Sequence, residues 1–200
     1  EAGIKARFFN NRLRADLSVF YTDIDDKQVR EEVPGGVGLW QFSNAAKAHT
    51  TGVELEFTAL LLKNLEVYGG VGYACTEVDD WIGTARGAAI DYSGNQLPWA
   101  PDLTANIGVS YQWDNGLYGL ADVSWTGKQY FDAANMLTEN GYALVNLKAG
   151  YKRGHWDISI WCKNLFDEAY ANKKVNDFRG RTMVEDGAPL TVGLTLSWRM

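Results

Sequence analysis

The sequence contains few of the features that would mark a disulfide-stapled domain, a metal site or a helical membrane protein. Its 200 residues include only two cysteines and two histidines, which exclude a disulfide framework and a zinc site of the usual spacing. No apolar run approaches the ~20 residues that a membrane-spanning helix requires, and the longest block lies near residues 59–62. The opening segment, EAGIKARFF, lacks the regions of a signal peptide and does not begin with Met. We therefore expect a mature piece or a fragment of a longer chain.

Positive charge is also scarce. Nineteen Lys and Arg residues stand against twenty-five Asp and Glu residues, so the formal net charge is −6 and no basic stripe is available. Because binding to a phosphate backbone depends on such cations, we expect no nucleic-acid partner. The excess of acidic residues leaves a cationic or metal-bearing ligand open as a partner, although a solvated acidic surface explains that excess more simply.

Aromatic residues and glycine, in contrast, are plentiful. Eight Trp, ten Tyr and eight Phe accompany twenty-one Gly and only four Pro, and 46% of the residues are hydrophobic. Aromatic residues favour strands, and glycine favours the turns between them. The composition therefore predicts a folded, all-β chain and argues against a helical bundle or a disordered segment.

Alternation of apolar and polar residues predicts about nine strands, close to the ~10 residues of a membrane-crossing β-strand. They cover residues 1–9, 12–30, 49–61, 64–78, 102–113, 116–130, 142–152, 155–169 and 189–200. Tight turns occur at Asn10-Asn11, Lys63-Asn64, Asp114-Asn115-Gly116 and Arg153-Gly154. Long connections occur at residues 31–48, 79–101, 131–141 and 170–188. Short and long connections alternate strictly, which places all tight turns at one end of an up-and-down sheet, as in bacterial outer-membrane barrels.

The two faces of the predicted strands differ as a barrel requires. In the final stretch, LTVGLTLSWRM, one face is fully apolar and the other is small, polar or charged. The apolar residues are Leu190, Val192, Leu194, Leu196, Trp198 and Met200. A soluble sandwich also alternates, but here the apolar strips start or end in Trp or Tyr, as aromatic girdles at a membrane do. We therefore expect lipid against the apolar face and an antiparallel, up-and-down transmembrane β-barrel.

An odd number of strands has a further consequence. Bacterial single-chain barrels normally contain an even number of strands, with both chain ends in the periplasm. Either one strand is miscounted or the chain is part of a larger barrel, and we favour the larger barrel.

Four stretches of the sequence narrow the class of barrel further. They are FFNNRLRADLSVFYTDIDDKQV (Phe8–Val29), NAAKAHTTGVELEF (Asn44–Phe57), LPWAPDLTANIGVSY (Leu97–Tyr111) and WCKNLFDEAY (Trp161–Tyr170). In this order and spacing they resemble the C-terminal barrel portion of TonB-dependent outer-membrane receptors, over essentially all of residues 1–200. The resemblance implies the C-terminal part of a 22-stranded barrel, with the N-terminal plug domain absent from this chain.

The resemblance also implies partners. TonB would be reached only through the missing N-terminal region, so this chain alone could not perform active transport. The barrel assembly machinery would recognise the last strand, with Gly193, Leu196 and Trp198, although Met200 stands where an aromatic residue is usual. Outer-membrane lipid and lipopolysaccharide would surround the barrel, and no cofactor is implied.

Residues suited to catalysis are not brought together by any motif. A nucleophile elbow, an H-E-x-x-H motif and a P-loop are all missing, and GVGY at Gly70–Tyr73 is not followed by the helix that a phosphate loop needs. We interpret His49 and His155 as solvated polar residues and Cys75 and Cys162 as small hydrophobic residues facing lipid. The chain is therefore not expected to be an enzyme or to bind a metal.

Ligand recognition is expected on the long loops, because rigid scaffolds carry binding residues on exposed connections. Aromatic surface combined with guanidinium donors suits anionic, aromatic-bearing ferric chelates. The candidates are Trp81, Arg86, Tyr130, Phe131, Arg179 and Arg181. Loop packing and contact with lipid headgroups explain the same residues and form the simpler interpretation. In NLFDEAY, Asn164 and Asp167 are expected to hydrogen-bond local backbone.

The resulting hypothesis is a receptor in the outer membrane of a Gram-negative bacterium that takes up a scarce nutrient, with a ferric siderophore as the leading ligand and TonB as the energy source. The alternative is a small stand-alone outer-membrane barrel that acts as a passive pore or a structural protein. A barrel-borne enzyme and a soluble ligand-binding barrel rank below both.

Overall fold

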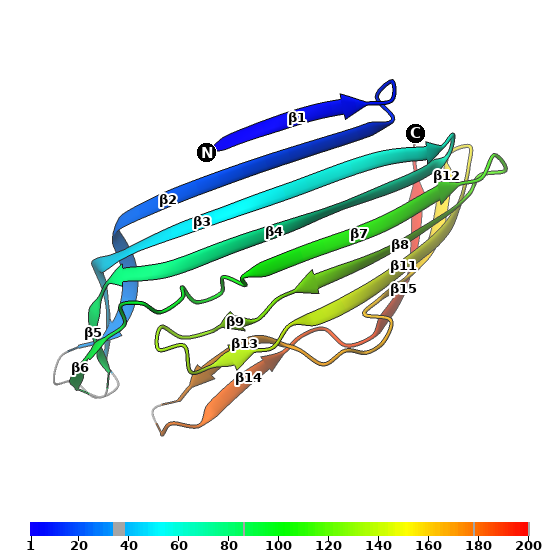
Figure 1. Cartoon of the computed structure of the whole chain (residues 1–200). Coiled ribbons are helices and arrows are strands. Elements are labelled where there is room, and N and C mark those ends of the chain that lie inside the picture. The colour runs from blue at the N-terminus through cyan, green and yellow to red at the C-terminus, as the bar shows by residue number, and fades with distance from the viewer. Residues whose placement is uncertain (34–38, 86, 178, 200) are drawn as a thin grey trace.

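The computed structural model describes residues 1–33, 39–85, 87–177 and 179–199, and all regular elements in these ranges are β-strands. The nine long strands are β1 (Ala2–Phe8), β2 (Leu13–Glu32), β3 (Trp40–Leu62), β4 (Leu65–Asp80), β7 (Leu103–Gln112), β8 (Leu117–Thr126), β11 (Tyr142–Arg153), β12 (Trp156–Lys163) and β15 (Thr191–Trp198). They form one antiparallel sheet in the order β1-β2-β3-β4-β7-β8-β11-β12-β15 (Figure 1). The predicted all-β, up-and-down fold with about nine strands is confirmed.

Three small ribbons lie in the long connections. β5 (Ile82–Ala85) pairs with β6 (Ala88–Asp91), β9 (Gln129–Tyr130) with β10 (Thr138–Glu139), and β13 (Ala171–Asn176) with β14 (Thr182–Asp186). All three lie beyond the same end of the large sheet, and the tight turns lie at the opposite end (Figure 1). We call these the loop end and the turn end.

The boundary of the third long strand was predicted wrongly. β3 begins at Trp40 and not at residue 49, because residues 40–48 continue the pairing with β2. The first long connection, expected at residues 31–48, is correspondingly shorter. Where a hairpin of a barrel projects beyond a membrane, backbone hydrogen bonds alone can extend it. Such a segment does not need the apolar alternation that marks a strand in the sequence.

Two strands end earlier than predicted. The expected strands 116–130 and 155–169 stop at Thr126 and Lys163. After the second of these, Asn164 adopts a φ of 51°, a left-handed conformation that turns the chain out of the sheet. Such a conformation depends on local side-chain bonds, so hydrophobic alternation does not reveal it.

Strand register gathers the apolar residues of all nine strands on one face. Leu17 lies opposite Leu55, and Ile160 lies opposite Leu194. These side chains have no protein cover, as the 73% exposure of Leu194 shows. The aromatic residues of this face at the turn end include Trp113, Trp156 and Trp198. An apolar face of this extent with an aromatic border matches a barrel surface that contacts lipid.

The opposite, polar face contains several glycines covered by an aromatic ring from the neighbouring strand. The ring of Tyr68 lies over Gly108, and the ring of Tyr118 lies over Gly150. A Cβ atom at either glycine would collide with the ring above it. The Tyr118 hydroxyl also donates a hydrogen bond to Asp157, at 2.8 Å. Glycine is therefore needed at these positions for close packing between strands.

Among the residues that the structure describes, no helix is both long enough and apolar enough to cross a membrane.

Candidate functional site at the loop end

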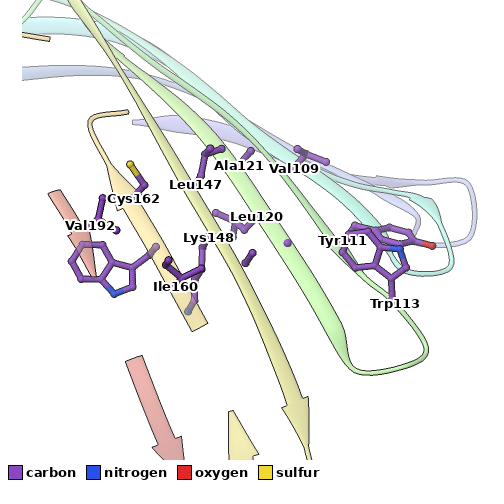
Figure 2. Close-up of a pocket in the computed structure, with 13 residues that line it drawn as sticks. Val109, Tyr111, Trp113, Leu120, Ala121, Leu147, Lys148, Ile160, Cys162 and Val192 are labelled. Atoms are coloured by element: carbon purple, nitrogen blue, oxygen red, sulfur yellow. The ribbon is translucent and has the colours of Figure 1, made fainter. Parts of the chain in front are cut away.

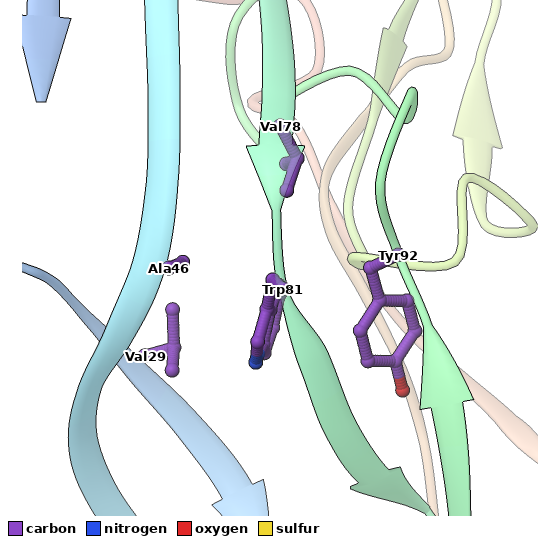
Figure 3. Close-up of a cluster of buried hydrophobic side chains, with 5 residues drawn as sticks. All are labelled: Val29, Ala46, Val78, Trp81 and Tyr92. Carbon is purple, nitrogen blue, oxygen red and sulfur yellow. The ribbon is translucent and has the colours of Figure 1, made fainter. Parts of the chain in front are cut away.

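A bulge in β2 directs an apolar side chain onto the polar face at the loop end. The pairing of β2 with β3 shifts between Ile24 and Lys27, where Asp26 has a φ of 53°. An extra residue in one strand reverses the alternation that follows it. Val29 can therefore join a buried cluster with Ala46, and Figure 3 shows the two side chains next to each other. The complete cluster consists of Val29, Ala46, Val78, Trp81 and Tyr92.

Trp81 is the largest residue of this cluster and was predicted as a ligand contact. Its side chain is only 7% exposed, and its ring centroid lies 4.5 Å from that of Tyr92. The indole nitrogen is buried without a hydrogen-bond partner among the described residues. In this structure the ring holds the β5–β6 connection against the strands, and direct contact with a ligand stays a prediction.

The second and third long connections are tied together by asparagine side chains. Asn135 donates to the carbonyl oxygen of Gln96 at 2.9 Å, and its own side-chain oxygen accepts from the Gln96 N–H at 2.8 Å. Asn95 donates to the carbonyl oxygen of Ala133 at 2.8 Å. Leu97 donates through its backbone N–H to the Thr76 hydroxyl on the polar face of β4, at 3.1 Å. The two connections therefore form one layer over the polar face.

Tyr130 and Phe131 lie where the two connections meet. The carbonyl oxygen of Tyr130 accepts a bond from the N–H of Trp99 at 2.8 Å, and the Lys128 ammonium lies 3.1 Å from the Tyr130 hydroxyl. Phe131 is 3% exposed and packs edge-on against Trp99, with centroids 6.3 Å apart. Phe131 thus has a packing role here, whereas the Lys128 ammonium lies over the half-buried ring of Tyr130, 4.8 Å from the ring centroid.

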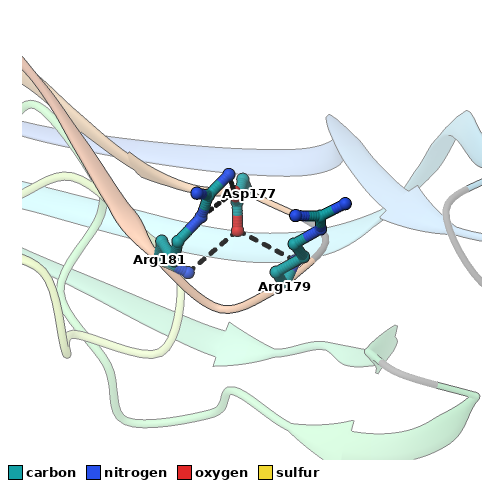
Figure 4. Close-up of polar contacts among 3 residues, drawn as sticks. All are labelled: Asp177, Arg179 and Arg181. Carbon is teal, nitrogen blue, oxygen red and sulfur yellow. Dashed lines mark hydrogen bonds and ion pairs between the residues drawn. The ribbon is translucent and has the colours of Figure 1, made fainter.

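The tip of the β13–β14 hairpin is organised around Asp177 (Figure 4). Its carboxylate accepts bonds from the backbone N–H groups of Arg179 and Arg181, at 2.8 and 2.9 Å, and from Arg181 Nε at 2.8 Å. The bond from the Arg181 N–H is the main cause that holds the pKa of Asp177 below its usual value. The Asp177 side chain is 9% exposed, but that of Arg181 is 70% exposed. The two predicted arginines therefore share one fixed tip, and Arg181 points its remaining donors to solvent.

Lys174 links this hairpin to the third connection. Its ammonium lies 2.7 Å from the Glu139 carboxylate and donates to the Thr138 carbonyl oxygen at 2.6 Å. Both charged side chains are mostly covered, with exposures of 24% and 14%. This contact was not predicted, because a lysine and a glutamate far apart in sequence give no local signal.

Tyr142 and Tyr170 form a stacked pair at the start of β11. Their ring centroids are 4.5 Å apart, with an interplanar angle of 21°. The Tyr170 ring also covers Gly187, leaving no room for a Cβ atom there. Sequence reasoning missed this pair as well, although the Tyr that ends NLFDEAY was noted within a motif. The pair adds aromatic surface to the loop end.

The predicted hydrogen bonding of Asn164 to local backbone is confirmed, whereas Asp167 bonds to backbone that is 23 residues away in the sequence. The side chain of Asn164, which is 4% exposed, donates to the carbonyl oxygens of Glu168 and Ala188 at 2.9 and 3.0 Å and accepts from the Glu168 N–H at 2.8 Å. Asp167 accepts from the N–H of Leu190 at 2.8 Å. These bonds anchor both ends of the fourth connection at the edge of the sheet.

The remaining predicted residues are Arg86, Met200, His49 and His155. Arg86 and Met200 lie outside the described residues. His49 contacts the Asp79 carboxylate at 2.7 Å, and His155 contacts the Arg199 carbonyl oxygen at 2.8 Å. Within the described ranges, no group of three or more His, Cys, Asp or Glu residues is arranged to hold a metal ion.

The amino-acid sequence of the chain is similar to those of known proteins. The model of the "TonB dependent receptor-like, beta-barrel" family matches residues 1–165. The pesticin receptor of Yersinia enterocolitica is 30% identical over 159 residues, which are 76% of this chain and 22% of that receptor. The metal-pseudopaline receptor CntO of Pseudomonas aeruginosa is 27% identical over 206 residues, covering 99% of this chain and 27% of that protein. The chain thus spans about a quarter of the length of these relatives.

Solved structures match it in fold. The siderophore receptor PiuA from Acinetobacter baumannii superposes with a TM-score of 0.79 at 21% identity, covering 98% of this chain and 27% of PiuA. The ferric yersiniabactin uptake receptor FyuA from Yersinia pestis gives the same TM-score at 24% identity, with 98% and 29% covered. Proteins of this family are receptors of the Gram-negative outer membrane and not enzymes. The chain belongs to the TonB-dependent receptor family and forms part of its β-barrel.

Proposed function

We propose that the protein carrying this chain is an outer-membrane receptor that takes up a scarce nutrient, namely a ferric siderophore or a similar metal chelate, with energy supplied through TonB. The match of the family model to residues 1–165 carries this proposal. The relatives named above are receptors for pesticin and for a metal-pseudopaline complex, and the structural neighbours include siderophore receptors. On this proposal the protein has no catalytic activity of its own.

The domain arrangement is also a proposal. We place residues 1–200 in the C-terminal part of a 22-stranded barrel, with the plug domain and the energy-coupling segment outside this chain. In the described sheet β1 and β15 are the outermost strands, and each has one neighbour. An open edge in lipid would leave backbone N–H and C=O groups without partners, so further strands must pair with both edges.

The loop end is the proposed capture surface. Short turns of such barrels face the periplasm and long loops face the exterior. Among the six predicted residues, Trp81 and Phe131 would set the shape of the surface from within, while Arg179, Arg181 and Tyr130 would meet the ligand. Asp177 supports this assignment because it fixes the backbone of both arginines. Guanidinium groups on a fixed tip suit an anionic chelate.

Growth under iron limitation tests the uptake function. The full-length protein would be expressed in a Gram-negative host without other siderophore receptors and supplied with a panel of ferric siderophores. We expect growth on at least one chelate, and no growth in the same host without TonB. Growth that does not depend on TonB, together with steady single-channel conductance in a planar bilayer, would support the passive pore instead.

Binding measurements test the capture surface once a chelate is known. The double variant Arg179→Gln/Arg181→Gln should weaken binding roughly 100-fold or more, since it removes two charged hydrogen bonds that contribute about 1.5–3 kcal/mol each. Lys173→Gln, which removes an exposed cation from β13 of the same hairpin, is the matched control and should bind normally. If the double variant and the wild type bind the chelate equally well, the two arginines are not part of the capture site. That result would leave the uptake proposal unaffected.

A further inference from the structure

An apolar groove crosses the outer face of the sheet at β8 and β11. Its floor consists of small residues on these strands, namely Gly119, Ala121 and Ala149. Figure 2 shows Val109, Tyr111 and Trp113 on one side of this floor and Ile160, Cys162 and Val192 on the other. The depression measures about 510 Å³, and its lining is almost entirely apolar.

The groove continues toward the turn end. A second depression, of about 530 Å³, shares Trp113, Ala149 and Ile160 with the first and adds Tyr151 and Leu194. Most residues of both depressions belong to the apolar face, as the cross-strand pairs Ala149↔Ile160 and Ile160↔Leu194 show. Because short turns of such barrels lie in the periplasm, the groove runs along the periplasmic half of the membrane.

An unpaired cation stands at the periplasmic mouth of this groove. Arg153 is exposed, it lies on the same face as Tyr151 two residues earlier, and it pairs across the turn with Trp156. Two residues of strand extend about 6.6 Å, so the side chain begins just beyond the aromatic border. No ion pair within the described ranges involves Arg153. A guanidinium at this level is placed to bind a phosphate by two hydrogen bonds.

We propose that the groove and Arg153 together form a binding site for one phospholipid of the periplasmic leaflet. An acyl chain fills the groove over Gly119, Ala121 and Ala149, and the phosphate binds the Arg153 guanidinium. The lipid is the occupant that fits, because the groove is continuous with the exposed apolar face of the barrel and Arg153 stands next to it at headgroup level. Lys148 also lines the groove, but its ammonium lies over the ring of Tyr118, 5.8 Å from the ring centroid. The site goes beyond nutrient uptake and does not depend on it.

Native mass spectrometry of the full-length receptor tests the site. The delipidated protein in detergent would be titrated with dioleoylphosphatidylglycerol, and bound lipids would be counted. Ala149→Phe fills the floor, and Arg153→Gln removes the phosphate partner. We expect each change to weaken the tightest lipid-binding event about tenfold or more.

Matched controls lie on the same strand. Ala143→Phe adds the same ring to the apolar face of β11 outside the groove, and Lys152→Gln removes the neighbouring cation, which alternates to the polar face. Both controls should bind lipid like the wild type. Arg153→Gln changes only an exposed residue and keeps the test decisive if Ala149→Phe does not fold. Three results would overturn the proposal. They are unchanged lipid binding in Arg153→Gln, equal losses of lipid binding in both controls, and the release of a co-purifying protein in place of lipid by Ala149→Phe.

Discussion

Single residues on the polar face decide how closely neighbouring strands approach. Gly108 and Gly150 each lie under a tyrosine ring of the adjacent strand, and Gly187 lies under Tyr170 in the fourth connection. The absence of a Cβ atom lets the ring lie flat over the backbone, where it covers backbone atoms that would otherwise be exposed. The abundance of glycine in the sequence is therefore partly a requirement for cross-strand packing and not only for turns.

We predict that Gly150→Val destabilises the barrel by about 1–3 kcal/mol, the usual cost of overpacking. The new side chain would displace the Tyr118 ring and break its 2.8 Å hydrogen bond to Asp157. Gly119→Val is the matched control, because the nearest atoms to an added Cβ at Gly119 are 3.7 Å away. Denaturant unfolding of the full-length protein in detergent would measure both. Similar unfolding midpoints for the two variants would contradict the packing role of Gly150.

At the scale of elements, the register of each strand fixes which side chains lie on the apolar face. β15 places Leu194 opposite Ile160 on the apolar face, while Thr195 accepts a hydrogen bond from the Trp161 indole at 3.1 Å on the polar face. Adjacent residues of one strand thus lie on opposite faces of the sheet. A shift of one residue would reverse every assignment, so the continuous apolar face is strong support for the register.

We predict that Leu194→Arg blocks stable membrane assembly, whereas Thr195→Arg permits it. A charged residue facing lipid near the midplane costs about 2–4 kcal/mol, while losing the Trp161 bond costs only about 0.5–1.5 kcal/mol. Heat-modifiable mobility of the protein in outer-membrane fractions would report folding of both variants. If both assemble equally well, the lipid-facing assignment of Leu194 is wrong.

The β13–β14 hairpin carries a pH dependence at its tip. The pKa of Asp177 is lowered in the folded hairpin, so its ionised carboxylate stabilises the tip. This stabilisation is fully present above the ordinary pKa of an aspartate. This contribution disappears as the pH falls through the lowered pKa. We expect slow amide exchange at Arg179 and Arg181 near neutral pH and faster exchange in acid, after correction for the intrinsic pH effect.

Asp177→Asn should show the fast exchange already at neutral pH, because the neutral amide is a weaker acceptor. Asp186→Asn is the control, since it changes an exposed carboxylate of the same hairpin. Exchange that stays slow in Asp177→Asn would show that the tip does not depend on this charge.

At the scale of the whole molecule, the nine-stranded sheet separates two kinds of surface. One is the exposed apolar face of the sheet. The other is the loop end, where the long connections are linked by side-chain hydrogen bonds and the Lys174–Glu139 ion pair. If these connections capture the ligand as proposed, the links between them lower the entropy lost on binding. In the described sheet β1 and β15 are the outermost strands, and on the proposed domain arrangement further strands pair with them.

We predict that the native protein, recovered from the outer-membrane fraction of its own cells, has roughly four times the mass of this chain, since the chain spans about a quarter of its relatives. Intact mass spectrometry would measure this. A mass close to that of the 200 residues alone would favour the stand-alone pore or structural protein.

The sequence by itself determined the number of long strands, their alternating faces, and the separation of short turns from long connections, because hydrophobic alternation and turn residues act over a few positions. It also pointed to Asn164 as a residue that hydrogen-bonds local backbone, as its bonds with Glu168 show, whereas the partner of Asp167, Leu190, is far away in the sequence. It did not determine where β3 begins or where β8 and β12 end. Only the tertiary structure decided that Trp81 and Phe131 are buried, and that Asp177 fixes both arginines of the hairpin tip. Whether a loop residue packs inward or meets solvent depends on which other loops fold against it. That choice is made by contacts such as Asn135 with Gln96, between residues far apart in the chain, and no local pattern encodes it.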